Sequence, residues 1–151
     1  MKINPSIFKA YDIRGIVDRT LTIEVVTLIG KAIGSQVRNG KSVCVGRDGR
    51  LSGPAITKAL IERIASTGVD VIDIGQTSSP GLYFATHALK TGNGVMVTGS
   101  HNPPEYNGLK IVLDGHAIYG EQIRNLLNRI NNKEFDIGDG CVTTENIGDR
   151  Y

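Results

Sequence analysis

Helix-like and strand-like patterns alternate along this chain, and this alternation limits the possible folds more than any other feature. Apolar residues recur at spacings of three and four over residues 22–38, as at Val26, Ile29 and Ile33, which predicts a helix capped by Thr22. We expect further helices at about 52–67, 79–91 and 120–132, and strands at 41–46, 69–74, 94–97 and 109–113. This order favours an α/β fold whose mostly parallel (mixed) sheet has helices on both faces.

Length and composition fit one such domain. A chain of 151 residues with 40% hydrophobic residues suits a single core, because about two-thirds of the unfolded surface is buried at this size. A formal net charge of +2 and 5% aromatic residues give no sign of nucleic-acid binding. No stretch approaches the roughly twenty apolar residues of a membrane span, and no apolar signal core begins the chain. We therefore expect a cytoplasmic protein without membrane contact.

The cysteines and the tail add two smaller predictions. Cys44 and Cys141 lie far apart and form no CxxC pair, so neither a disulfide nor a zinc site is indicated. Cys44 lies in an apolar run and is predicted to be a core thiol. The tail mixes glycines with acidic and polar residues, so we predict one domain over 1–135 and a linker over 136–151 toward a missing second domain.

The most informative local feature is the segment TGSHNPPEYNGLK at Thr98–Lys110. Apolar runs precede and follow it, so two strands should hold its polar groups at a sheet edge. The dipeptide Asn107-Gly108 is a strong turn signal, and we expect it to reverse the chain and bring Lys110 close to Ser100. A serine beside a lysine suggests group transfer.

Ser100 follows the carboxyl end of a predicted strand, where ligands bind in sheets of this type. Arg47 and Asp48 also follow a strand, so they are expected near the loop, either as a structural ion pair or as substrate ligands. A plainer interpretation of Ser100 is open as well, because serine is common in ordinary turns. His87 and His116 are interpreted as structural or surface residues.

Two familiar site types do not match. A nucleophile elbow needs glycine two residues before and after its serine, whereas Thr98 and Asn102 flank Ser100. A Walker loop needs a glycine where this chain has Ser35, and a strand follows instead of a helix. Neither an α/β-hydrolase nor a nucleotide-binding protein is indicated.

Three motifs resemble one known family. Thr98–Lys110 is similar to the phosphoserine loop of the α-D-phosphohexomutases. Phe8–Gly15, FKAYDIRG, resembles the start of the phosphomannomutase/phosphoglucomutase branch, and Gly46–Ser52, GRDGRLS, is similar to the strand end that lies between these motifs. The resemblance spans essentially the whole chain and covers the first of the family's four domains.

The resemblance implies a reversible transfer of a phosphoryl group between O6 and O1 of a hexose phosphate. Ser100 would carry the phosphoryl group, and a hexose 1,6-bisphosphate would be both intermediate and activator. Lys110 would be the general acid/base for the sugar hydroxyl, and His101 matches the histidine beside the phosphoserine. Arg14 matches a residue near the phosphoryl group, and this cationic set suits a phosphoserine, which carries about −1.5 to −2 charges.

Two more residues and the metal come from the same resemblance. Tyr11 matches a residue near the substrate, and Asn102 would support the loop and its contacts. The family binds Mg²⁺ through an aspartate-rich loop of its second domain, so the phosphoserine oxygen of Ser100 would be the ligand supplied by this chain. The partners implied are mannose and glucose 1- and 6-phosphates, which Tyr106 and the AYDIRG start favour, and the remaining domains. The preference between the two sugars stays open.

Two alternatives remain. This chain is a phosphate-carrying or structural module that is inactive without the other domains, or it is a serine hydrolase that uses Ser100 with His101 or Lys110. The hydrolase is less favoured, because adjacent side chains in an extended loop point apart and no third group orients a base.

Overall fold

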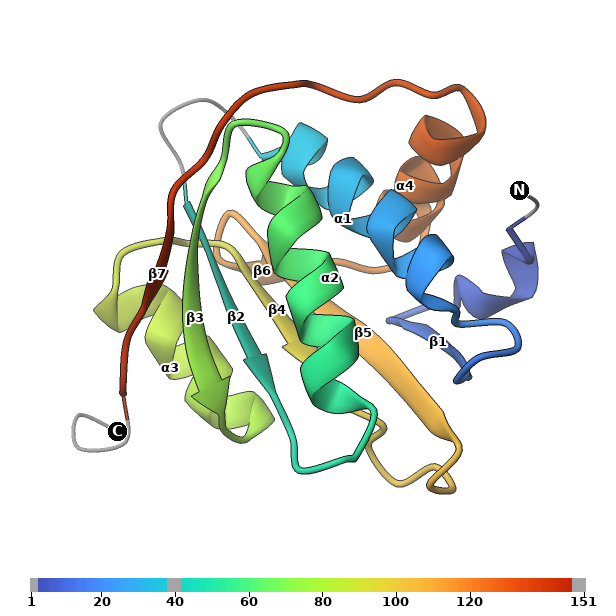
Figure 1. Ribbon diagram of the computed structural model, residues 1–151, viewed down its shortest axis with the longest axis horizontal. Helices are drawn as coiled ribbons and strands as arrows, with labels where there is room; N and C mark the ends of the chain where they lie inside the picture. Colours follow the sequence, from blue (N-terminus) through green and yellow to red (C-terminus); the bar gives the residue numbers. More distant parts are fainter. Residues whose placement is uncertain (1–2, 38–41, 148–151) are drawn as a thin grey trace.

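The computed structural model describes residues 3–37 and 42–147, which form four α-helices, a short 3-10 helix and seven strands in one sheet (Figure 1). The helices are η1 (Pro5–Ile7), α1 (Ile23–Gln36), α2 (Gly53–Ala65), α3 (Ser79–Ala88) and α4 (Glu121–Asn131). The strands are β1 (Ile13–Ile16), β2 (Ser42–Arg47), β3 (Asp70–Gln76), β4 (Gly94–Val97), β5 (Tyr106–Leu113), β6 (His116–Ala117) and β7 (Val142–Thr144). The positions expected at 38 and 41 for the end of the first helix and the start of the next strand lie outside the described residues.

The sheet is mixed, in the order β1-β5-β4-β2-β3-β7, with β6 paired to β5. The pairs β2–β4, β2–β3 and β3–β7 are parallel, whereas β5 is antiparallel to β1, β4 and β6. The predicted α/β class, with a returning strand after the serine loop, is therefore confirmed. Strands β1, β6 and β7 are short and were not among the predicted elements.

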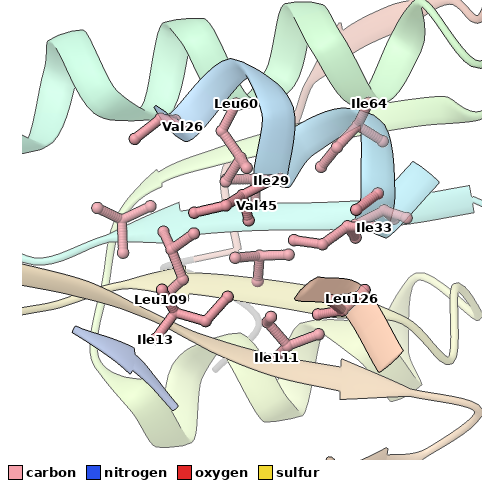
Figure 2. Packing of buried hydrophobic residues seen from close by; sticks show 14 of the residues in the cluster. Ile13, Val26, Ile29, Ile33, Val45, Leu60, Ile64, Leu109, Ile111 and Leu126 are labelled. Carbon is pink, nitrogen blue, oxygen red and sulfur yellow. The ribbon is translucent and has the colours of Figure 1, made fainter. Parts of the chain in front are cut away.

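Helix α1 forms as its sequence predicts. The Thr22 Oγ1 accepts a hydrogen bond from the Val25 N–H at 3.1 Å, which satisfies one of the free donors at the helix start. Ile29 and Ile33 are fully buried on the face toward the sheet, and Figure 2 shows both pointing at the strands, near Val45. The three-and-four spacing therefore supplies the apolar stripe that attaches this helix.

The two faces of the sheet carry cores of different size. The larger core lies between the sheet and α1, α2 and α4 (Figure 1). The smaller core lies under α3 and includes Cys44, Leu82 and Met96. All four residues of β4 are buried, so the strand that leads into the serine loop is fixed from both sides. None of the helices in the described ranges is long and apolar enough to cross a membrane.

The segment after α4, expected to be a linker, packs along the sheet over its described part. It crosses the top of the molecule in Figure 1 and then runs beside β3 as β7. The Gly140 N–H donates to the Ala65 carbonyl at 2.8 Å, and Ile147 is buried under α3. The predicted boundary at residue 135 stays a prediction, but these residues add an edge strand, because parallel pairing satisfies their backbone groups.

The two cysteines differ in exposure, as expected for Cys44. Cys44 is fully buried and Cys141 is exposed. Burial raises the pKa of the Cys44 thiol, an effect that its hydrogen bond with Thr91 partly opposes. Cys44 therefore has less reactive thiolate at neutral pH than a free thiol.

We predict that a thiol reagent labels one cysteine in the native protein and the second only after denaturation. Cys141 should react in the native protein because it is exposed, and Cys44 should react only after unfolding because it is buried. Colorimetric thiol counting with and without denaturant measures this. Native Cys141→Ser should not react; fast labelling of that variant would contradict the burial of Cys44.

Candidate active site at the serine loop

The serine loop, residues 98–105, consists of two consecutive turns between β4 and β5. The Asn102 N–H donates to the Gly99 carbonyl at 3.0 Å, which closes the first turn. The Tyr106 N–H donates to the Pro103 carbonyl at 3.0 Å, which closes the second. The loop thus reverses the chain before Asn107 is reached.

The prediction that Asn107-Gly108 makes the turn is wrong, because both residues are buried inside β5. Asn107 donates through Nδ2 to Ser52 Oγ at 2.9 Å, which links β5 to the start of α2. Gly108 faces Arg14 across the β1–β5 pair, and a Cβ there would meet the Ile13 carbonyl oxygen and come within 3.2 Å of Arg14 Cα. This position needs glycine for close strand approach, not for turning.

Ser100 has an unusual backbone conformation. Its φ is +53°, in the left-handed region that few non-glycine residues adopt. Its N–H donates to Thr98 Oγ1 at 3.0 Å, and the residue is exposed. His101, next in the same turn, is also exposed. Such conformations persist where surrounding bonds enforce them and are concentrated at functional sites.

Asp48 helps to hold the turn that contains Ser100. Its Oδ2 accepts hydrogen bonds from Thr98 Oγ1 at 2.8 Å and from the Gly99 N–H at 3.1 Å. The ion pair recorded for Asp48 is with Arg50, at 3.7 Å between Nε and Oδ2, and not with Arg47. The expected Arg47–Asp48 pair is therefore corrected: Asp48 braces the loop, and Arg47 lies beside the first turn of α2, near Gly53.

Arg50 holds the loop from the other side, and sequence reasoning did not single it out. Its guanidinium donates to four carbonyl oxygens at 2.7–3.1 Å: those of Ser100, Asn102 and Pro103 in the loop and that of Tyr106 at the start of β5. The available signal was the expectation that Arg47 and Asp48, which precede Arg50 in the same segment, lie near the loop. Which of its charges reaches the loop depends on the turn before α2.

The register of β5 places two predicted cations on one face of the sheet. Arg14 lies opposite Gly108, and Lys110 lies two residues further along β5, so their side chains share a face. Lys110 is opposite Met96, which belongs to the core under α3, and yet Lys110 is exposed. The α3 side of β5 is therefore open at Lys110.

Two tyrosines border this open face. Tyr11 and Tyr119 are exposed, and their ring centroids are 6.4 Å apart. The β5–β6 register, continued by the bond from the Ile118 N–H to the Ile111 carbonyl, brings Tyr119 opposite Lys110. Tyr119 was not among the predicted site residues, because it has no motif and joins the site only through strand pairing.

A pocket of about 440 Å³ lies between the opening segment and the serine loop. Lys9 and Arg14 line one side, and Asn102 and Pro103 line the other. No acidic residue is among the lining residues, so the pocket suits an anion. Asn102 also donates through Nδ2 to the Gly99 carbonyl at 2.9 Å, within the first turn.

The remaining predicted or dismissed residues lie elsewhere. His87, in α3, packs edge-on against Tyr83 at 4.8 Å between ring centroids, and His116 is exposed in β6.

Over residues 3–37 and 42–147, no group of three or more His, Cys, Asp or Glu side chains is placed to hold a metal ion. The oxygens of Asp48, the carboxylate braced against the loop, are already engaged there. The residues present therefore do not by themselves fit a Mg²⁺ site.

Comparison with known proteins agrees with this arrangement. Residues 5–137 match the family model for phosphoglucomutase/phosphomannomutase, alpha/beta/alpha domain I. The chain is 49% identical over 148 residues to a phosphomannomutase/phosphoglucomutase of Pseudomonas aeruginosa, covering 97% of this chain and 32% of that protein. It is 45% identical over 149 residues to a phosphoglucomutase of Neisseria meningitidis serogroup B, covering 96% and 32%.

A solved structure shows the same fold. The crystal structure of a phosphoglucomutase/phosphomannomutase family protein from Burkholderia thailandensis aligns with a TM-score of 0.94 at 46% identity, covering 99% of this chain and 35% of that one. This chain therefore belongs to the phosphoglucomutase/phosphomannomutase family and corresponds to its domain I, as the motifs predicted. It spans about a third of the length of the curated relatives it matches.

We predict that Gly108→Ala lowers the free energy of unfolding by about 1–3 kcal/mol, because the new Cβ overpacks the β1–β5 contact. Denaturant unfolding followed by circular dichroism measures this. Gly53→Ala is the matched control, since its Cβ would meet its nearest neighbour at an ordinary 3.4 Å in α2. Equal stability of both variants would show that close strand approach does not require Gly108.

Proposed function

We propose that Ser100 carries a phosphoryl group in the reversible conversion of hexose 1- and 6-phosphates, carried out together with the remaining domains of a longer polypeptide. One observation carries the proposal: Ser100 is exposed on a left-handed turn that Asp48 and Arg50 brace after β4, and the strand that follows this loop, β5, has Lys110 and the paired Arg14 on one face. The names of the relatives support the same substrate class.

The charges around the loop suit this role. A phosphoserine brings about −1.5 to −2 charges, and phosphoryl transfer depends mainly on positioning and on neutralising charge in a loose transition state. Arg14 supplies a permanent cation on the open face, Lys110 becomes a cation there when it takes up the hydroxyl proton, and His101 supplies a donor on the same turn as Ser100. Tyr11 borders that face and is the proposed contact for the sugar.

The transfer step balances without an external reactant. The hydroxyl O6 of a hexose 1-phosphate bonds to phosphorus as the bond from phosphorus to Ser100 Oγ breaks. Lys110 takes the hydroxyl proton, and the departing Oγ takes up one proton, so none is consumed overall. Transfer from O1 of the resulting bisphosphate back to Ser100 leaves a hexose 6-phosphate. Free hexose 1,6-bisphosphate would reload an empty Ser100, which is the activator role.

Most of the Mg²⁺ ligands in this proposal belong to other segments. A phosphorylated Ser100 would offer one oxygen ligand, whereas the described residues supply no carboxylate cluster beside it. The other metal ligands, and the loops that distinguish mannose from glucose, are proposed to lie in the remaining domains. Without those ligands, the 151-residue chain is proposed to be inactive alone. We also propose that the domain ends near residue 135.

The serine hydrolase is the weaker alternative. In the described ranges, neither His101 nor Lys110 makes a hydrogen bond to Ser100 Oγ, so the nucleophile–base contact of such enzymes is not formed. Organophosphate labelling of Ser100 would favour the hydrolase.

Incubation with glucose 1,6-bisphosphate and Mg²⁺ is expected to add one phosphoryl group to the polypeptide that carries the remaining domains. Intact-mass spectrometry measures the added group. Ser100→Ala should abolish it, because the acceptor hydroxyl is gone, and Ser79→Ala, at another exposed serine, should retain it. Normal turnover of Ser100→Ala would refute the proposal.

Lys110→Met is expected to leave the fold intact and to reduce mutase activity about 100- to 10,000-fold, the range for losing a general acid/base. The fold should persist because Lys110 is exposed. Thermal unfolding and a coupled assay of hexose 6-phosphate formation measure the two effects. Lys58→Met, at an exposed position of α2, is the control; if Lys110→Met unfolds, the lysine is structural.

A further inference from the structure

One guanidinium binds three carbonyl groups of the serine loop and a fourth at the start of β5. Arg50 Nη1 donates to the carbonyl oxygens of Pro103 at 2.7 Å and Tyr106 at 3.1 Å. Its Nη2 donates to those of Asn102 at 2.7 Å and Ser100 at 3.1 Å. The planar fork of arginine can bridge both turns at once, which the single ammonium of lysine cannot do.

Asp48 and Gly99 also lie against this guanidinium. Asp48 Oδ2 lies 3.7 Å from Arg50 Nε, and the Asp48 Oδ1 accepts the Arg50 backbone N–H at 3.1 Å. A Cβ on Gly99 would overlap Arg50 Cζ and Nε. Because Gly99, the residue before Ser100, has no side chain, the guanidinium can occupy the space where a Cβ would lie.

These contacts leave Arg50 no Nη donor for a ligand. An arginine has five N–H donors; the two on Nη1 and the two on Nη2 match four carbonyl oxygens, and Nε faces Asp48. The Arg50 side chain is 17% exposed. Binding a substrate phosphate through Arg50 would release the loop, so a direct ligand role conflicts with this geometry.

We infer that Arg50 is the positioning residue of the phosphoryl carrier: it collects the loop carbonyls on one side and so holds Ser100 in its left-handed conformation, turned to the acceptor. The inference rests on the proposed function of Ser100. Carbonyl dipoles drawn to Arg50 are kept from facing the transferred anion, and charge-assisted bonds are strong enough to fix a strained turn. The role needs the fork geometry and not the charge alone.

Amide hydrogen exchange tests the positioning directly, without any activity. In Arg50→Lys and Arg50→Met, exchange at the Asn102 and Tyr106 amides, which close the two turns, should rise about 10- to 100-fold, as expected for losing bonds to a charged group. Amides of β4 and of β5 beyond Tyr106 should stay within about threefold. The control Arg63→Met removes an exposed arginine of α2 and should change neither set.

Two exchange results would overturn the inference. Wild-type protection in Arg50→Lys would show that charge suffices and that the fork is irrelevant. Equal loss of protection in the loop and in β4 would show that Arg50 holds the whole domain rather than the loop. Neither outcome depends on whether Ser100 is phosphorylated, so failure of the proposed function remains distinguishable.

Kinetics of the polypeptide with its remaining domains separate positioning from binding. Arg50→Lys should lower kcat at least about tenfold with KM within about twofold, because a misplaced Ser100 affects the transfer and not substrate affinity. A raised KM with unchanged kcat would instead make Arg50 a substrate ligand and overturn the inference. Arg63→Met should alter neither constant.

Discussion

The site depends on β5 lying antiparallel between β4 and β1. Pairing with β4 carries the serine loop, and pairing with β1 brings Arg14 beside the strand that carries Lys110. Gly108 permits this arrangement, because any side chain there would meet the backbone of β1. The mixed sheet thus places Arg14, from the first motif, and Lys110, from the last, on one open face. A wholly parallel sheet could not join β4 to β5 through a loop as short as residues 98–105, because parallel strands need a long crossover connection.

Around that strand, charged groups are used to shape the backbone. Asp48 accepts from the start of the serine loop, and Arg50 donates to its carbonyls, so both charges of the turn before α2 are committed to one neighbour. Ser100 has a positive φ, which is energetically unfavourable for a residue with a side chain, and these hydrogen bonds compensate for that conformational energy. Arg14 and Lys110, which share the open face, are the cations proposed to meet a ligand.

The structure also shows how the chain relates to its larger relatives. The face with Arg14, Lys110 and the two tyrosines is open, and the described residues form no metal cluster beside the serine loop. The relatives are about three times as long. The proposed carrier role of Ser100, with further ligands proposed on the remaining domains, fits chemistry that occurs between domains, where water can be excluded when they close.

Periodic apolar residues and caps such as Thr22 act locally, so they predict the class of fold, the positions of the main helices and the serine loop without any knowledge of tertiary contacts. The sequence also identified the family from motifs. Tertiary structure decided what local rules could not: Asn107-Gly108 is a turn signal by composition, yet close packing against β1 uses its glycine inside a strand. Arg50 and Tyr119 reach the site only through contacts between distant segments, whose geometry no spacing along the chain encodes.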